Sequence, residues 1–494
     1  MTTNNGDILS QPFLIADDNI PNRYEDEDES VSDDDIRFAR IIFRSRGAPQ
    51  LLMLSLILSF GISSTIGVIP DVMAHRYASL HHGYTGPDCS TFDRIDKPDA
   101  CQEGSDDAQE SAALGAFFKN MWTLTLNSLI GSISDVQGRK YFMVLAMILS
   151  TLSPVMLVLM QVITSMEPVW FYIFDSTTGA VNSMSISFAM LSDIMPPKWR
   201  APAFGMLLAA YYIGFSFAPS LPLLMTHFQV SLFSLVLLFV GVVFALFWLP
   251  ETLPADVAEN NRTVREQQEE KLGWKIMVRP IMALSILNRD TFFRLLAAGS
   301  FLSGIVYSSD AVLVVYYVKD QLNVRDTDLA HMFFIMGILG IAIQAFLLKP
   351  MISYFGDKGL LVISFLSGTC HNACYALARG KGMIYVAFCL AQLTKTNFPL
   401  LSSLAANNVD KHEQGRIQGA LFALTALADA IGPISLEYIY GQTKATLGPG
   451  TMFAFAAFCY FVGTVFVSFL PTKGRKRSDT AGTTEEQVLL EPLP

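Results

Sequence analysis

Long apolar runs recur along this sequence and limit what it can fold into. The first of them, Leu51 to Pro70, contains no charged residue. A run of about 20 apolar residues can cross a bilayer as a helix, because a helix satisfies its own backbone polar groups in lipid. Further runs lie at about 112–133, 141–163, 168–193, 203–225, 230–249, 292–317, 330–348, 359–378, 383–405, 416–440 and 450–470. The sequence therefore predicts an all-α membrane protein with twelve transmembrane helices, the tenth interrupted by Lys395 and Pro399.

The composition agrees with a membrane protein. Only 16% of the residues are charged, against roughly 25% in soluble proteins. The net charge of −10 comes largely from an acidic N-terminal stretch, with Glu25–Glu29 and Asp33–Asp35. Such a stretch cannot bury enough apolar surface to fold, so we expect a disordered, solvated tail and do not take its charge as a sign of an ionic partner.

The chain divides into two halves of six runs each. The longest polar stretch between runs is 250–290, and both halves end at a proline, in Leu249-Pro250 and Leu470-Pro471. A proline directly after an apolar run ends a helix. The predicted domains are a disordered tail (1–47), a six-helix bundle (48–250), a linker loop (251–290), a second six-helix bundle (291–472) and a tail (473–494). In a membrane protein built from two related helical bundles, a ligand site is expected near the midplane between the halves.

Positive charge places the termini. Lys and Arg that flank membrane helices prefer the cytoplasm, and most of them fall on the side of both termini. The loops on the other side hold fewer than half as many: Arg76, Arg94, Lys97, Lys319, Arg325, Arg379, Lys381 and Lys444. We therefore expect both termini in the cytoplasm. The loop 75–111 then lies outside or in a lumen, where Cys89 and Cys101 either form a disulfide or remain free.

A short loop between the second and third runs carries an acid, a glycine and two cations: Asp135, Gly138, Arg139 and Lys140, preceded by Gly131. We expect Gly138 to permit a tight turn and Asp135 to accept hydrogen bonds at a helix N-terminus. Arg139 can bind a carboxylate with two parallel hydrogen bonds, and Asp193 at the end of the fourth run is the candidate partner.

This loop resembles the loop-2/3 signature of the major facilitator superfamily, with Val136 where the family usually has arginine. The fifth run resembles the motif of the drug–proton antiporters in that superfamily, with alanine in place of one glycine, through Gly205, Gly214, Ala218 and Pro219. The segment 193–205, which includes Arg200, and the segment 415–433 look like the tetracycline-exporter-like branch. The resemblance implies two six-helix bundles and a cytoplasmic gate formed by Gly131, Asp135, Gly138, Arg139, Lys140, Asp193 and Arg200.

Away from their ends, the predicted spans contain the charged residues Lys119, Asp175, Asp310, Lys395 and Asp429, with Glu437 nearer an end. Charges in the membrane are costly and usually serve a substrate or proton pathway. Asp175 and Asp429 are the first candidates for proton transfer, although Asp175 stands where the family often has arginine. Lys395 either pairs with Asp429, as a static ion pair, or faces an anionic or carbonyl-bearing substrate. Asp310 lies on the pathway or at a solvated interface.

These features predict a secondary transporter that moves a small organic molecule by alternating access, with proton-coupled export as the favoured mode. The alternatives are a proton-independent uniporter or importer and a non-transporting sensor on the same fold. The sequence contains none of the phosphate-binding, zinc-protease or hydrolase motifs that would indicate an enzyme. We expect a monomer with no cofactor, no metal and no nucleic acid, in the plasma membrane or, from the acidic dileucine pattern at 485–490, in a vacuolar or endosomal membrane.

Overall fold

The structure is a computed structural model that describes residues 40–196, 199–255, 258–259, 262–263, 284–409 and 414–471. The acidic tail before residue 40, the middle of the predicted linker loop at 264–283 and the tail from residue 472, with its dileucine pattern, lie outside the described residues. The predictions made for those segments therefore remain predictions.

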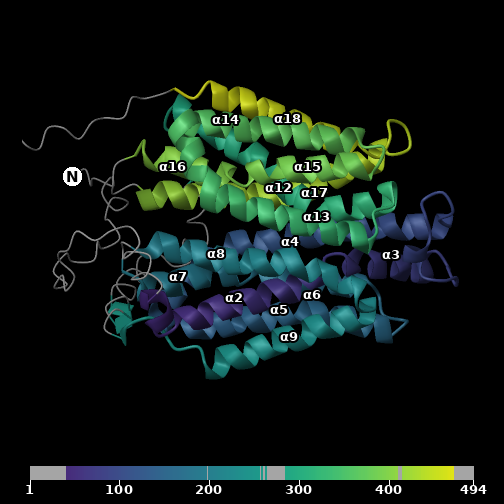
Figure 1. Cartoon of the computed structure of the whole chain (residues 1–494), viewed down its shortest axis with the longest axis horizontal. Coiled ribbons are helices and arrows are strands. Elements are labelled where there is room, and N and C mark those ends of the chain that lie inside the picture. The colour runs from purple at the N-terminus through teal and green to yellow at the C-terminus, as the bar shows by residue number, and fades with distance from the viewer. Residues whose placement is uncertain are drawn as a thin grey trace, which may run out of the picture.

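The described part of the first half contains the helices α2 to α9, of which α4 is the longest (Figure 1). In chain order the helices are α2 (Ala48–Ser64), α3 (Val68–His81), α4 (Asp99–Gln137), α5 (Arg139–Val162), α6 (Val169–Ser176), α7 (Ser183–Ile194), α8 (Arg200–Phe217) and α9 (His227–Phe247). Short 3-10 turns lie at η1 (Cys89–Thr91), η2 (Thr177–Gly179) and η4 (Ala218–Leu223).

The second half begins after the linker with a 3-10 turn, η5 (Leu284–Asn288). Its α-helices are α12 (Thr291–Leu322), α13 (Asp326–Ile341), α14 (Leu348–Leu377), α15 (Lys381–Thr394), α16 (Asn397–Ala406), α17 (Gln414–Thr443) and α18 (Thr451–Ser468). A π-helical turn, η6 (Ala342–Leu347), joins α13 to α14. Within α14 the backbone turns at Gly356, whose φ of 69° separates the end of the eighth span from the ninth.

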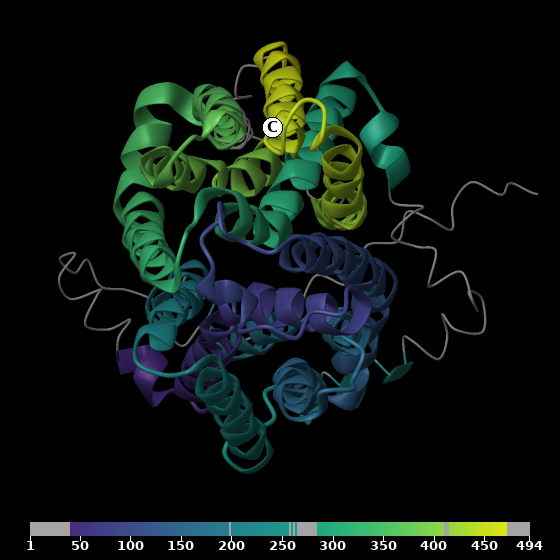
Figure 2. The same cartoon turned by 90° about the vertical axis from the view of Figure 1, so that its right-hand side faces the viewer.

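The two halves lie side by side with their helices roughly parallel (Figure 1), and the view along the helices separates α2–α9 from α12–α18 (Figure 2). Each half has its own apolar core, built around Leu51, Phe142 and Leu238 in the first half and around Phe365 and Tyr460 in the second. The halves touch where α4 packs on α12 and α17 and where α8 packs on α13. Side chains of α3 and of the loop before α4 make further contacts with the second half.

The structure confirms the all-helical membrane class. Eight helices of the described chain are long and apolar enough to cross a membrane. The other four predicted spans correspond to α4, to α6 with α7, to α13 with η6, and to α15 with α16. These four are either rich in polar residues or interrupted, which is why length and composition do not identify them.

The first two spans differ from the prediction. The first run does not end at Pro70, because α2 breaks at 65–67 and α3 continues to His81; α4 starts at Asp99 instead of near residue 112. The predicted outer loop 75–111 is therefore largely helical. Gly104 explains the close packing of α3 on α4, since a Cβ at this position would lie 2.4 Å from the carbonyl oxygen of Ala74.

The fourth and tenth spans are both broken near their middle. Residues 177–182 separate α6 from α7, and Lys395 with Thr396 separates α15 from α16. Pro399 does not cause the second break, because it lies in the first turn of α16, where its missing N–H has no helical partner to lose. Equivalent positions in the two halves therefore carry interrupted helices, and in transporters such interruptions indicate where a ligand binds.

The motif of the fifth span contains two glycines with different surroundings. A Cβ at Gly214 would lie 2.6 Å from Ser59 Oγ and 2.7 Å from the backbone nitrogen of Phe60, both in α2, whereas nothing lies within 4 Å of a Cβ at Gly205. Beyond them α8 ends at Phe217, and Ala218 and Pro219 begin the 3-10 turn η4. Only the second glycine is therefore needed for helix packing, as small residues are at close contacts in lipid.

Substitution of these two glycines should have opposite effects on stability. Gly214→Ala forces α8 away from α2 and should cost about 1–3 kcal/mol, the usual range for overpacking. Gly205→Ala adds a better helix former in open space and should stabilise by about 0.4–1 kcal/mol. Thermal unfolding of both purified variants in the same detergent tests this. A Gly214→Ala variant as stable as the parent would contradict the close packing of α2 and α8.

Candidate functional site

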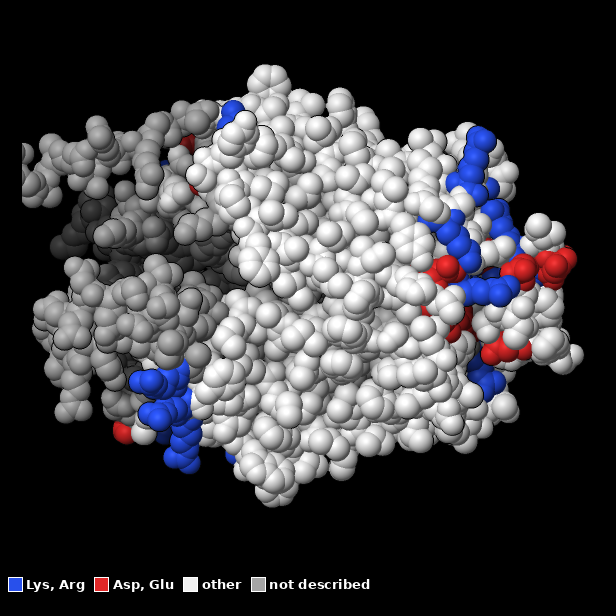
Figure 3. Space-filling model, in the orientation of Figure 1, with Lys and Arg blue, Asp and Glu red and all other residues white. Residues whose placement is uncertain are grey.

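Charged side chains gather at the two ends of the molecule. On the face drawn in Figure 3, Lys, Arg, Asp and Glu occupy the ends of the helices, and a broad band between them is uncharged. One end carries the Cys89–Cys101 disulfide and the other carries Gly138, so we call them the disulfide end and the Gly138 end. A band without charges is the surface expected in contact with lipid.

Four ionisable side chains form a cross-half cluster at the disulfide end, which we call the latch cluster. Lys319 Nζ of the second half lies 2.5 Å from Asp71 Oδ2 of the first half and 2.7 Å from Asp326 Oδ1. His227 Nε2 of the first half lies 3.1 Å from Asp326 Oδ2. The side chain of Asp71 is only 12% exposed, because α3 continues past it and packs against the other half.

Within the latch cluster, His227 and Lys319 stabilise the ionised form of Asp326. Burial opposes ionisation of Asp326, but hydrogen bonds from His227 and Lys319 outweigh it and lower the pKa of Asp326 to about 2. The ion pair of Asp326 therefore contributes stability above its usual pKa of 3.8 and loses it only as pH falls toward 2. Asp71, His227 and Asp326 are close enough to hold a metal ion, but the Lys319 ammonium group already donates to both carboxylates.

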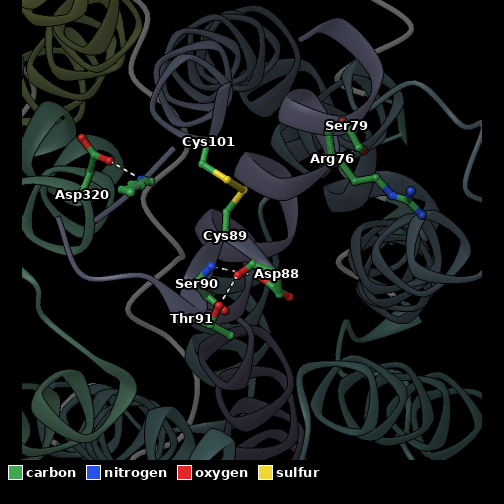
Figure 4. Close-up of a disulfide and its surroundings, with 9 residues drawn as sticks. Arg76, Ser79, Asp88, Cys89, Ser90, Thr91, Cys101 and Asp320 are labelled. Carbon is green, nitrogen blue, oxygen red and sulfur yellow. Dashed lines mark hydrogen bonds and ion pairs between the residues drawn. A yellow bond between two sulfur atoms is a disulfide. The ribbon is translucent and has the colours of Figure 1, made fainter. Parts of the chain in front are cut away.

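The disulfide closes a loop that also bonds to the second half (Figure 4). Cys89 and Cys101 are joined, and both side chains are buried against Ala78. Within the loop, Lys97 pairs with Asp320 at the end of α12. Arg94 Nη1 donates to the carbonyl oxygen of Gln321 over 2.9 Å. The loop from Cys89 to Cys101 therefore connects the two halves, and the disulfide limits how far it can move.

A second polar cluster lies at the Gly138 end within the first half. Arg139 Nε lies 3.2 Å from Asp193 Oδ2, and Arg139 Nη1 lies 2.5 Å from Asp135 Oδ1. Arg139 Nη1 also donates to Ser134 Oγ over 2.8 Å. Gly138, with a φ of 102°, provides the turn between α4 and α5. Asp135 and Arg139 are therefore brought together with Asp193, and the arginine ties the start of α5 to the end of α7.

Asp135 does not cap a helix N-terminus, contrary to our expectation. It lies in the last turn of α4, where the helix dipole is negative, and Arg139 compensates its charge. The N-terminus of α5 is capped by Glu251 instead: its carboxylate accepts hydrogen bonds from the backbone N–H groups of Arg139 (2.9 Å) and Lys140 (3.0 Å). No sequence pattern indicated this role, because Glu251 lies 112 positions along the chain from Arg139.

The remaining residues predicted for the gate take lesser positions. Gly131 lies inside α4 with open space beside it, and Arg200 Nε donates to the carbonyl oxygen of Met195, outside the Arg139 cluster. The second half has an equivalent arrangement that the sequence reading missed. After the turn at Gly356, Lys358 Nζ donates to the carbonyl oxygen of Leu470 over 2.7 Å. In both halves, therefore, the start of the third span is bonded to the segment that follows the sixth span.

Three of the charged residues at membrane level, Lys119, Asp175 and Asp310, have partners in their own half. Lys119 Nζ of α4 lies 3.3 Å from Asp175 Oδ2 of α6. Asp310 Oδ2 of α12 lies 2.9 Å from His371 Nε2 of α14, and His371 is almost fully buried. The Asp310 side chain is 17% exposed, so it is not at a solvated interface. The sequence signal for its partner was a histidine inside an apolar run.

Asp429 and Lys395 do not pair with each other. Asp429 Oδ1 is buried and has no hydrogen-bond partner among the described residues, and its backbone oxygen accepts from Asn120 of the other half over 3.0 Å. Lys395 Nζ instead lies 5.2 Å from the ring centre of Tyr212 and 5.8 Å from that of Phe215. Of the two sequence alternatives for Lys395, the static ion pair with Asp429 is wrong.

The energetics of Lys395 favour a further partner. A charged side chain in the bilayer interior costs about 2.5–3.5 kcal/mol on insertion scales. A cation over an aromatic ring gains about 0.5–1 kcal/mol at exposed sites and about 2 kcal/mol when desolvated. The two rings therefore offset part of the cost, and nothing in the described part of the chain supplies a negative charge at ion-pair distance.

Comparisons with known proteins agree with this architecture. A model described as the Major Facilitator Superfamily matches residues 51–433. The chain is similar to Hippocampus abundant transcript-like protein 1 of Bos taurus, at 23% identity over 366 residues, which cover 69% of this chain and 70% of that protein. It is also similar to the class H tetracycline resistance protein of Pasteurella multocida, at 23% identity over 325 residues, which cover 64% of this chain and 76% of that protein.

Among solved structures, the fold is similar to the crystal structure of the human organic anion transporter MFSD10 (TETRAN). The TM-score is 0.59 at 17% sequence identity, and the match covers 87% of this chain and 99% of that one. At this identity the similarity supports the arrangement of helices and carries no information about a ligand.

Proposed function

Because the chain belongs to the major facilitator superfamily, we propose that it is a secondary transporter that exports a small organic molecule in exchange for protons. The family and its transporter relatives support membrane transport. Direction and proton coupling belong to the proposal, and the similarity to a tetracycline resistance protein favours export. The mechanism is alternating access, in which the two halves rock about a site between them.

Contacts between the halves at the disulfide end support alternating access. The latch cluster and the pair of Lys97 with Asp320 both join the first half to the second, and the aromatic side chains of Tyr172 and Tyr316 share a hydrogen bond of 3.0 Å across the same boundary. Polar contacts of this kind can form and break without unfolding either half. The structure therefore corresponds, in our proposal, to the state closed at the disulfide end.

The orientation follows from charge. We place the Gly138 end, with Arg139, Lys140 and Arg200, in the cytoplasm together with both termini, in accord with the distribution of Lys and Arg. The disulfide end then faces the cell exterior or a lumen, where a disulfide is stable. Both the plasma membrane and a vacuolar or endosomal membrane satisfy this orientation.

The environment of the Asp429 side chain is the one observation that supports proton coupling. Its carboxyl group has a buried oxygen without a hydrogen-bond partner among the described residues, and it lies on α17 where Asn120 of the opposite half contacts its backbone. A dry environment disfavours the charged form of a carboxyl group, and contact with water restores it. Rocking of the halves would alternate these two environments at Asp429, which is what proton exchange requires.

The test begins with a thermal-shift screen of the purified chain against metabolites and drugs, because a ligand of the native state raises its apparent stability. The ligand found is then added to proteoliposomes with a pH-sensitive dye inside. Antiport predicts that the ligand gradient drives proton flux. Ligand flux without proton flux indicates the uniporter alternative, and binding without any flux indicates a sensor.

Asp429→Asn should retain ligand binding. The proton flux that the ligand drives should fall about tenfold or more, because an amide does not bind or release a proton near neutral pH. The matched control is Glu110→Gln, at an exposed carboxylate of α4, which should leave the flux close to that of the parent. Proton flux in Asp429→Asn equal to that in Glu110→Gln would remove Asp429 from the proposal.

A further inference from the structure

Lys395 occupies the break in the tenth span and differs in its partners from the charges near the equivalent break of the first half. In the first half, Asp175 precedes the break between α6 and α7 and is already paired with Lys119. In the second half, Lys395 stands at the break between α15 and α16. No carboxylate of the described residues lies at ion-pair distance from it. One of the two interrupted spans thus presents a cation without a counter-ion.

The surroundings of Lys395 combine residues from both halves. The rings of Tyr212 and Phe215 come from α8 of the first half. Their centres lie 5.2 and 5.8 Å from the ammonium nitrogen of Lys395. Lys395 itself belongs to the second half. A ligand held here would therefore contact both halves at once, as a substrate of alternating access must.

A second polar group beside Lys395 also lacks a partner. Gln392 is 1% exposed, and its Oε1 has no hydrogen-bond partner among the described residues. A Cβ added at Gly340 would lie 3.4 Å from Gln392 Oε1 and 3.9 Å from Lys395 Nζ, so both polar atoms face the same bare stretch of α13. Buried polar atoms are normally satisfied, and an orphan beside an unpaired cation indicates a place for a ligand.

We propose that an organic monoanion with an aromatic or other flat apolar body binds between the halves, with its carboxylate or sulfonate on Lys395. This inference rests on the proposed function only for the movement of the ligand. One ammonium group with no counter-ion takes one negative charge, and a charge-assisted hydrogen bond is the strongest contact that it can make. Tyr212 and Phe215 pack on the apolar body, and Gln392 bonds a polar substituent next to the anionic group.

The chemistry excludes a simple cation as the ligand of this subsite, because Lys395 would repel it. It also distinguishes the subsite from the Lys119–Asp175 pair, whose lysine is already neutralised.

The test is thermal protection of the purified full-length chain by three naphthalene probes of one shape: 2-naphthoate, 2-naphthylmethanol and 2-naphthylmethylammonium. We expect the anion to bind at least tenfold more tightly than the alcohol, and the ammonium compound to bind most weakly. Equal protection by the anion and the ammonium compound would overturn the proposal. This comparison needs no variant and so does not depend on whether a substitution folds.

Variants then locate the site. Lys395→Gln should weaken 2-naphthoate at least tenfold, and Lys395→Arg should retain most of the affinity because arginine keeps the charge. The matched control is Lys381→Gln, on the same helix α15 and paired with Asp328, which should bind as the parent does. Unchanged binding in Lys395→Gln, or an equal loss in Lys381→Gln, would place the anion elsewhere.

The outcomes separate this inference from the proposed function. Charge-selective binding that depends on Lys395, with no flux of the same anion in proteoliposomes, supports the site and contradicts transport. Flux of an organic molecule that is unaffected by Lys395→Gln supports transport and overturns the site.

Discussion

Replacement of Lys319 by methionine will open the disulfide end of the molecule. Lys319 is 10% exposed and bonds to Asp71 of the first half and to Asp326 of the second. Removal of one partner from a buried ion pair costs about 3–5 kcal/mol, and each 1.4 kcal/mol changes an equilibrium constant tenfold. The state closed at this end should therefore lose stability by a factor of about 10² to 4 × 10³ relative to an open state.

The loss should fall on the contact between the halves and leave each half folded. Distances between spin labels report this directly, with cysteines introduced at Leu224 of the first half and Leu447 of the second, which are 81% and 76% exposed. The background keeps the disulfide and lacks the four free cysteines: Cys370, Cys374, Cys389 and Cys459. We expect a single narrow distance distribution in the parent and a longer, broader distribution in Lys319→Met.

Lys381→Met is the matched control for this measurement. It breaks the ion pair of Lys381 with Asp328, which lies wholly within the second half and is more exposed. Surface pairs contribute about 0–1 kcal/mol, and this one does not cross the boundary between the halves. Equal label distances in Lys319→Met and the parent would show that the latch cluster does not hold the end closed.

Removal of the disulfide should produce the second large effect. Without it, the loop from Cys89 to Cys101 gains conformational freedom, and a constraint on a loop of about this length is worth about 3 kcal/mol. The loop carries Arg94 and Lys97, whose bonds to Gln321 and Asp320 join the halves. The Cys89→Ala/Cys101→Ala variant should therefore both unfold at lower temperature and show the longer distance between labels at residues 224 and 447.

A reductant provides the control for this experiment. With maleimide-linked labels, which reduction does not release, dithiothreitol should lengthen the distance in the parent and have no further effect on the double alanine variant. If the double variant unfolds at a lower temperature but keeps the parent's distance between the labels at residues 224 and 447, the disulfide stabilises the fold without contributing to closure.

The apolar runs were sufficient to predict a helical membrane protein with two halves, because lipid leaves few alternatives to a helix for a long apolar segment. The tight turn at Gly138 was also predictable, because a glycine adopts a positive φ at little cost whatever its distant surroundings. Asp193 could be chosen as a partner because it ends the neighbouring span. In each of these cases the relevant interaction is local or is imposed by the bilayer.

Prediction was weaker where partners come from distant parts of the chain. Asp71 and Lys319 lie in different halves of the chain, and only the packing of α3 against the second half brings them together. Glu251 is 112 positions from the N–H group of Arg139 that it caps, and spacing cannot reveal such a contact. The sequence did not decide whether Cys89 and Cys101 are paired or free, because two cysteines in a loop do not specify the distance between them.

What the sequence by itself determined is the class of the protein: membrane-spanning helices, their division into two sets of six runs and the family signature, all of which depend on hydrophobicity and local turns. The tertiary structure alone decided which charges within the membrane spans have partners. It pairs Lys119 with Asp175 and Asp310 with His371, and it leaves Lys395 among aromatic rings. The reason is physical: an ion pair depends on a separation of a few ångströms between atoms, which the packing of helices sets and which no pattern along one chain contains.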